Sequence, residues 1–443
     1  MKVTEQLAQY AVEASIQSFP KEVIHQGKRC FLDLLGVALG GSQQPLTQIL
    51  SQMAKDFGGP PQATIWGKGR KTDIFHAALT NGAMAHALDF DDTHIGSIIH
   101  PSAPVIPAIL AIAEWRGLSG RQALEAFIVG YEIEIHVGLG MGKLHYDRGW
   151  HSTATCGRFG AAAACGKLIG LSQEVMARAL GLAGTQAAGL RLVFGTMAKP
   201  FHPGKSALDG MLSALLAQRG FTCVTNIIEG KKGYFEVLGE KSRLAPMIQG
   251  LGKKYEILRN TFKPYAACLL THPTIDGLIQ IREKYQPRIE DIQEIQCEVA
   301  KFCMDAAGQK EPQTGLAGKF SIYYCAALAL AEGTAGEDQF TEQRVQDPRL
   351  GALQKKVKTK INPRFKETEA KVTVLMKDGK KYSLFIDCPK GDPGNPPADQ
   401  DLEYKFRSLA GMVLSKAKVN SLAPMIWSLE KIKDIRQLIR HCH

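Results

Sequence analysis

The chain has 443 residues, of which 45% are hydrophobic and 22% charged, with a formal net charge of +11. This composition is typical of a folded globular protein and excludes extensive disorder, and the length favours two domains. The longest apolar stretches, such as residues 104–114 and 161–171, are too short for a membrane span of about 20 apolar residues. The N-terminus carries charges where a signal peptide would be apolar, so we expect a cytoplasmic protein that does not bind membranes.

The predicted elements of the first 255 residues are helices. Apolar residues recur at three- and four-residue spacing, and small residues dominate two later stretches that we expect at the centre of a helical core. The predicted helices cover residues 3–18, 21–40, 46–57, 73–88, 157–170 and 177–189.

The pattern changes after about residue 258. Residues 291–300 alternate as a half-buried strand does, and residues 370–387 form two such runs around Asp378-Gly379, a strong hairpin signal. A helix is expected over 321–332, a linker over 389–397, and helices again over 402–414 and 425–441. We therefore predict a mostly α fold with an α+β part. Residues 1–258 and 398–443 form a large all-helical domain, and residues 259–397 an inserted α+β domain.

Cysteine usage and charge narrow the classes of function. The ten cysteines include no CxxC pair, so we expect buried thiols and no zinc site, iron–sulfur cluster or disulfide framework. The densest basic run, residues 355–366, contains one aromatic residue and no nucleic-acid-binding signature. A solvated face is the favoured interpretation. Nucleic-acid binding stays an alternative, and a steep salt dependence would reveal it.

The densest polar cluster is DFDDTH, which begins at Asp89 and is followed by His100. On a helix, Asp89 and Thr93 would lie one turn apart on a single face, and His100 would be available for proton transfer. The alternative is a capped loop that faces solvent. A metal-diphosphate site is disfavoured because the chain has no second acidic motif.

Three more clusters contain candidate site residues. His151 precedes a small-residue helix that Ser152 or Thr153 would cap, and a helix N-terminus favours an anion. Residues 194–205 form a proline-rich stretch that we predict to be a rigid loop, in which Lys199 would hold a carboxylate. The fourth cluster, KPYAAC, begins at Lys263. For each, an ordinary structural role is the alternative. GLGMGK over residues 138–143 does not have phosphate-loop spacing, and neither GxSxG nor HExxH occurs.

Taken in order, these segments resemble the signature motifs of the MmgE/PrpD family, which includes 2-methylcitrate dehydratase, cis-aconitate decarboxylase and iminodisuccinate epimerase. The matching stretches, within residues 81–330, are NGAMAHALDFDDTH, HPSAPVIPA, GWHSTATCGRFGAAAA, FGTMAKPFHPGKSALDG, KPYAACLLTHP and GKFSIYYCAAL. The resemblance implies a large helical domain with an α+β lid domain, an active site between them, a homodimer, and catalysis without metal or organic cofactor.

The resemblance also assigns roles to particular residues. By motif position it places Asp89, Thr93, His100 and His151 among catalytic residues, and Lys199 and Lys263 among substrate-binding residues. His202 and Cys268 are further substrate-binding candidates from the same motifs. The position of Cys268 carries histidine in the decarboxylase, and a tyrosine expected near Met304 is absent. These departures weigh against cis-aconitate decarboxylation, and Cys268 resembles the epimerase and other bacterial members.

The predicted function is a cofactor-independent lyase, a dehydratase or decarboxylase, that acts on a small di- or tricarboxylate such as 2-methylcitrate or cis-aconitate. Lys199 and Lys263 would neutralise substrate carboxylates, and His151 or His100 would remove a proton next to one of them. The other histidine, or the Asp89/Thr93 pair orienting it, would supply the returning proton. Two alternatives stay open, an epimerase of a small dicarboxylate using the same site and a non-catalytic or nucleic-acid-binding helical protein.

Overall fold

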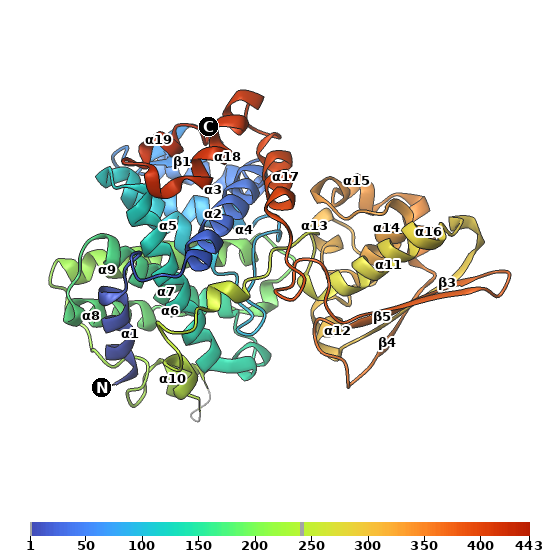
Figure 1. Ribbon diagram of the computed structural model, residues 1–443, viewed down its shortest axis with the longest axis horizontal. Coiled ribbons are helices and arrows are strands. Elements are labelled where there is room, and N and C mark those ends of the chain that lie inside the picture. The colour runs from blue at the N-terminus through green and yellow to red at the C-terminus, as the bar shows by residue number, and fades with distance from the viewer. Residues whose placement is uncertain (1, 240–242) are drawn as a thin grey trace. The chain divides into compact units, whose positions relative to one another are not determined.

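The computed structural model describes residues 2–239 and 243–443 (Figure 1). The chain forms two compact units. Unit 1 comprises the described residues of Met1–Ala87, Asp91–Thr261 and Ala398–His443, and unit 2 comprises Leu88–Phe90 and Phe262–Pro397. The fold is mostly α with an α+β part, which confirms the predicted fold class.

Unit 1 consists almost entirely of helices. Its helices are α1 (Val3–Glu13), α2 (Lys21–Gly41), α3 (Pro45–Phe57), α4 (Ile74–His86), α5 (Ser102–Arg116), α6 (Gly120–Asp147), α7 (Ser152–Leu168), α8 (Gln173–Thr185), α9 (Ala198–Gln218), α10 (Tyr234–Leu238), α17 (Asp399–Ala410), α18 (Lys416–Trp427) and α19 (Arg436–Ile439). Among the described residues, no helix has the length and apolarity needed to cross a membrane.

The centre of unit 1 is built from helices rich in small residues. Helix α7 packs against α5, α6, α8 and α9, and α4 packs against α9. The α4–α9 crossing is so close that a Cβ on Gly204 would lie 2.2 Å from the carbonyl oxygen of Leu79. A Cβ on Gly82 would likewise lie 2.7 Å from the Cα of Gly204. Glycine is therefore required on both helices, and the crossing fixes the end of α4 against the start of α9.

Predictions near the two ends of the sequence of unit 1 need correction. A short antiparallel pair, β1 (Ala63–Ile65) and β2 (Arg70–Thr72), lies in a region where no strand was predicted. Each strand has three residues, too few for an alternating pattern to stand out. The helix predicted over 425–441 is also wrong. The chain leaves α18 at Trp427, makes a 3₁₀ turn over Leu429–Lys431, and re-forms a helix only at α19.

Unit 2 combines a four-stranded sheet with helices. Its elements are α11 (His272–Tyr285), β3 (Ile292–Val299), α12 (Lys301–Ala307), α13 (Gly315–Gly318), α14 (Ile322–Glu332), α15 (Glu342–Val345), α16 (Pro348–Gln354), β4 (Val357–Ile361), β5 (Ala370–Met376) and β6 (Lys381–Ile386). The strand order is β4-β3-β5-β6, with β3 and β4 parallel and the other pairs antiparallel. Helix α11 packs against β5 and β6, and α14 against β4 and α11.

The sheet follows from the alternation in the sequence, except at its edge. Strand β3, the β5–β6 hairpin and α14 lie where the pattern predicts them. Strand β4 was missed because it lies inside the basic run. Its sequence is VKTKI, and Lys358 and Lys360 are exposed as expected of a solvated face. Lysines on an edge strand are a common protection against pairing with another chain.

All ten cysteines are free, and eight of them are buried. Burial raises the pKa of the thiols of Cys156, Cys297 and Cys325 to about 12. These groups stay protonated near neutral pH, so they act as small apolar side chains and not as nucleophiles.

Candidate active site

The loop that joins α4 to α5 is buried in spite of its charges. Asp91, Asp92 and His94 are each at most 1% exposed. Helix α4 has already ended at His86, so the helical face predicted for Asp89 and Thr93 does not exist, and the solvent-facing alternative is wrong as well.

Backbone bridges and strain define the shape of this loop. Thr93 pairs with Thr261 through backbone hydrogen bonds of 2.9 and 2.8 Å, and His94 pairs with Ile99. Asp89 and Ile98 adopt positive φ angles of 50° and 56°, which are costly for residues with a side chain and above all for a β-branched one. Such strain persists only where the surrounding contacts enforce it, and it is frequent at functional sites.

Asp92 fastens the loop to the start of α5. Its Oδ2 accepts hydrogen bonds from the Ser102 hydroxyl at 2.6 Å and from the Asn260 amide at 2.9 Å. Burial, together with the nearby charge of Asp33, raises the pKa of Asp92 to about 7. The sequence pattern does not distinguish Asp92 from the neighbouring aspartates.

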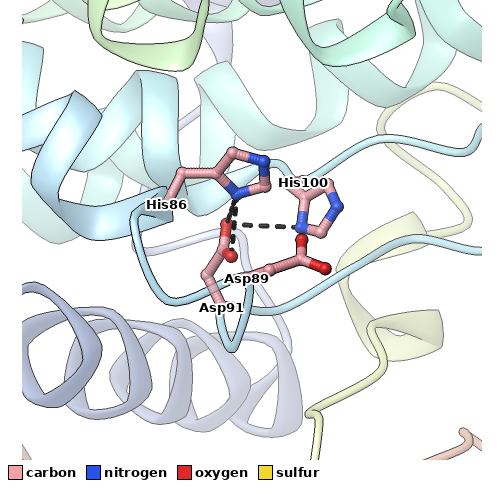
Figure 2. Close-up of side chains that lie close together, drawn as sticks. All are labelled: His86, Asp89, Asp91 and His100. Carbon is pink, nitrogen blue, oxygen red and sulfur yellow. Dashed lines mark hydrogen bonds and ion pairs between the residues drawn. The ribbon is translucent and has the colours of Figure 1, made fainter. Parts of the chain in front are cut away.

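Asp91 bridges two histidines (Figure 2). The Nδ1 of His86 lies 2.8 and 2.9 Å from the two carboxylate oxygens, and the Nδ1 of His100 lies 3.3 Å from Oδ2. The Thr93 hydroxyl also lies 3.3 Å from that His100 nitrogen. The centroids of the His86 and His100 rings are 4.4 Å apart. Asp89, which Figure 2 also labels, belongs to unit 2 and is described with it below.

The electrostatics of this group favour a charged Asp91 and a neutral His86. Burial, together with the charge of Lys199, outweighs the opposite effect of Asp91 and lowers the pKa of His86 to about 3. Burial alone would raise the pKa of the Asp91 carboxyl. The interactions with His86 and His100 outweigh that effect and hold this pKa well below its usual range. A neutral His86 whose Nδ1–H donates to Asp91 has a lone pair on Nε2, and that buried atom has no hydrogen-bond partner within residues 2–239 and 243–443.

A second histidine pair lies beside the first. His151 lies at the N-terminus of α7, as predicted, but it is itself the N-cap residue, and the predicted caps Ser152 and Thr153 lie inside the helix. The Nδ1 atoms of His151 and His202 are 2.9 Å apart, so a single proton lies between them. The ring of His151 stacks on that of His86 with centroids 6.1 Å apart.

Lys199 lies in the first turn of α9, so the rigid loop predicted there is wrong. Pro200 misled the prediction, because a proline in the first turn lacks an N–H that has no helical partner anyway. Lys199 is 5% exposed, and its Nζ lies 5.2 Å from the centre of the Phe194 ring. Burial and the Lys199 charge lower the pKa of His151 well below its usual value. Burial, Arg158 and Lys199 lower that of His202 to about 4.

The three other candidates lie in unit 2. Lys263 donates to the backbone oxygen of Asp89 at 2.7 Å and lies 3.3 Å from its Oδ1. Lys319, which the sequence analysis quoted in GKFSIYYCAAL but did not single out, donates to the backbone oxygen of Leu88 and pairs with Glu337 at 2.5 Å. Cys268 is buried, and its backbone N–H donates to the Lys319 carbonyl at 2.9 Å.

The structure thus groups the predicted residues in two sets. Thr93, His100, His151, Lys199 and His202 form one cluster in unit 1. Asp89 and Lys263 form a pair in unit 2, with Cys268 nearby through Lys319. His86 and Asp91 were not among the predicted functional residues. Both residues could have been noticed, because they lie on either side of Asp89 in AHALDFDD. They were overlooked because AHAL was interpreted as an apolar stretch before the polar cluster.

The histidine–aspartate group also raises the question of a metal. Within the described residues, one group of side chains is compact enough to share a cation, and in it the ligand atoms of His86, Asp91 and His100 lie within 4.8 Å of one another. Both Nδ1 atoms lie within 3.3 Å of an Asp91 oxygen, where a proton on each nitrogen would face the carboxylate. A nitrogen that carries such a proton has no lone pair for a cation. The donor set fits a hydrogen-bonded relay. The GLGMGK stretch lies within the bounds of α6, whose helix is interrupted at Gly142 (φ 67°, ψ 178°). Residues 138–141 are helical, so the stretch does not form a phosphate-binding loop.

Comparison with known proteins identifies the family. The MmgE/PrpD N-terminal domain model matches residues 5–247, and the MmgE/PrpD C-terminal domain model matches residues 265–431. The chain is 27% identical to the cis-aconitate decarboxylase of Aspergillus terreus, over 99% of this chain and 95% of that protein. It is 28% identical to the cis-aconitate decarboxylase of Homo sapiens, over 98% and 92%. It is 25% identical to the mitochondrial 2-methylcitrate dehydratase of Yarrowia lipolytica, over 83% and 73%. The chain belongs to the MmgE/PrpD family.

Proposed function

We propose that this MmgE/PrpD-type enzyme is a lyase that acts on a small tricarboxylate, with His100 as the general base and Lys199 as a carboxylate-binding cation. The names of the relatives, cis-aconitate decarboxylase and 2-methylcitrate dehydratase, support the reaction class. The observation that carries the assignment of the base is the contact between Asp91 and the Nδ1 of His100.

A proton on Nδ1 of His100, directed at Asp91 and Thr93, leaves the lone pair of Nε2 as the base. His100 is also the more accessible of the two Asp91-linked histidines. Its side chain is 12% exposed, whereas that of His86 is fully buried. A substrate therefore reaches His100 first, and we assign proton removal to it.

Removal of a proton next to a carboxylate moves negative charge onto that carboxylate. Lys199 is almost buried, and a cation in such a site stabilises developing charge more strongly than one in water. The same charge lowers the pKa values of the surrounding histidines, so these stay neutral and able to take up a proton at neutral pH.

The His151–His202 pair is suited to return a proton, because the two Nδ1 atoms share one. In a dehydration, the proton of the C–H bond goes to Nε2 of His100 and the electrons of that bond form a C=C bond. The C–O electrons leave with the hydroxyl, which becomes water by taking a proton from His151, and the proton held by His100 restores the His151–His202 pair after the product leaves. In a decarboxylation, a C–C bond breaks, carbon dioxide leaves with no electrons from that bond, and the carbanion takes the proton. Asp89 stays a catalytic candidate, and Lys263 and Cys268 stay substrate-binding candidates, in unit 2.

The reaction is tested by incubating the protein with citrate, 2-methylcitrate and cis-aconitate in deuterium oxide with EDTA present, and following the products by NMR. Loss of water or carbon dioxide from one acid supports the proposal and names the substrate. Exchange or inversion without such loss would replace the lyase by an isomerase. No change in any of the three acids would contradict the substrate class.

The base is tested with His100→Gln. We expect kcat to fall about 10²- to 10⁴-fold, the usual contribution of a positioned general base. The matched control is His25→Gln, because His25 is a histidine whose side chain is 48% exposed beside Asp399. Circular dichroism checks that both variants fold. A kcat of His100→Gln equal to that of the control would reject His100 as the base.

A further inference from the structure

We propose that His86 is a positioning residue, whose Nδ1–H holds the Asp91 carboxylate so that Asp91 directs the Nδ1–H of His100. This proposal rests on the proposed function in that His100 is taken as the base. After His100 and Asp91, His86 is then the third residue of the relay, and it does not itself contact the substrate.

The geometry of Asp91 is the first step. Both of its oxygens lie within 2.9 Å of the His86 Nδ1, and the side chains of both residues are fully buried. A carboxylate without water keeps its charge only where donors reach it, and His86 supplies the shorter of its two histidine contacts. Without His86, the anion would rely on His100 alone among the histidines.

The geometry of His86 is the second step. Its Nε2 is buried and has no hydrogen-bond partner among the residues that the structure describes, so the polar contact of the ring within this part of the chain is that of Nδ1 with Asp91. The ring also packs against the rings of His100 and His151, with centroid distances of 4.4 and 6.1 Å. His86 is therefore placed to act on His100 through Asp91 and not as a second base.

Other charged or titratable groups also act on the relay. They are Lys199 from α9, His151 from α7, Asp33 from α2 and Asp92 from the same loop as Asp91. Each of them stays in place when His86 alone is changed, so a variant at His86 isolates its own contribution.

The test compares His86→Leu with His86→Asn. The leucine variant removes the donor, whereas the amide nitrogen of asparagine can occupy the place of Nδ1. Without a competing donor, Asp91 interacts more strongly with His100 and holds the proton on it to higher pH. We expect the acidic limb of the kcat/KM profile to move up by about one pH unit in His86→Leu, with kcat at least about 10-fold lower. In His86→Asn the limb should stay in place.

An NMR titration of the His100 imidazole in the same variants separates this proposal from the proposed function. If the wild-type protein turns over no tricarboxylate but the His100 titration still moves in His86→Leu, only the proposed function fails. If neither the titration nor the profile moves in His86→Leu, the positioning role is overturned. An equal loss of kcat in both variants, with the limb unmoved, would show a merely structural role and also overturn it. Should His86→Leu fail to fold, His86→Gln, whose amide reaches past the Nδ1 position, takes its place.

Discussion

At the scale of single residues, the protonation of the histidine cluster is set by burial and by one cation. His86, His151 and His202 all have lowered pKa values, and Lys199 contributes to each. A cluster of imidazoles beside a buried ammonium thus stays neutral at neutral pH. Proton transfer by histidine needs such a neutral form at the start of the reaction.

This electrostatic coupling predicts the effect of Lys199→Met. Because the positive charge is removed, the pKa of His202 should rise from about 4 towards its usual value, by about one unit, in an NMR titration. The KM for the tricarboxylate should rise as well. Lys199→Arg keeps the charge and is the matched control. An unchanged His202 titration in Lys199→Met would mean that burial alone sets this pKa.

Glu134 gives a second residue-scale prediction, through stability. Its two carboxylate oxygens are buried and have no hydrogen-bond partner in the described part of the chain. Burial, with a smaller contribution from Asp92, raises its pKa well above the usual 4.5. The folded protein therefore keeps a proton that the unfolded chain releases above about pH 4.5, so this residue lowers the stability as the pH rises.

Glu134→Gln removes this titration. The free energy of unfolding of the variant minus that of the wild type should increase with pH above 4.5, by at most about 1.4 kcal/mol per unit. Urea unfolding at a series of pH values measures it, and Glu22→Gln, a change at an exposed glutamate of α2, is the control. A difference that does not change with pH would mean that Glu134 is ionised in the folded state.

At the scale of elements, the site depends on how closely α4 and α9 approach. Helix α4 ends at His86, and α9 carries Lys199 in its first turn, so their crossing at Gly82 and Gly204 sets where the cation lies relative to the relay. Because glycines at the crossing let the two backbones touch, the helices hold His86 and Lys199 in a rigid arrangement.

We therefore expect Gly204→Ala to disturb both stability and catalysis. The new Cβ would meet backbone atoms of Leu79 and Ala83, which cannot move without shifting α4. The free energy of unfolding should fall by about 1–3 kcal/mol, and kcat/KM should fall with it. The control is Gly351→Ala in α16, where a Cβ meets nothing within 4 Å and the helix should gain about 0.5–1 kcal/mol. Equal stability of both variants would contradict the close crossing.

At the scale of the whole molecule, the net charge of +11 accords with an anionic small-molecule substrate. We expect kcat/KM for the tricarboxylate to fall several-fold between about 50 mM and about 300 mM KCl, because salt screens long-range attraction. The value of kcat should change little and serves as the internal control. Salt-sensitive binding of duplex DNA, with no salt effect on kcat/KM, would instead favour the nucleic-acid alternative.

Much of the fold could be predicted because its signals are local. Helical spacing, the Asp378-Gly379 turn and the alternation before it identify elements from a few neighbouring residues. The errors occurred where local signals mislead. The prolines near the start of α9 led to the prediction of a loop there. The lysines of β4 led to the prediction of a solvated basic run without a strand. The apolar residues after Met425 continue a helical pattern although the helix ends at Ser428.

The family, the mostly helical fold with its α+β part, and the motif residues Thr93, His100 and His151 can be recognised without coordinates. A motif is read along the chain, so it can be found before any contact is known. Which charged groups contact one another depends on the folded structure. The link from His86 through Asp91 to His100 depends on where α4 ends and on the left-handed turn that follows it. Burial, which sets the protonation of these groups, arises from helices far apart in the sequence that exclude water together.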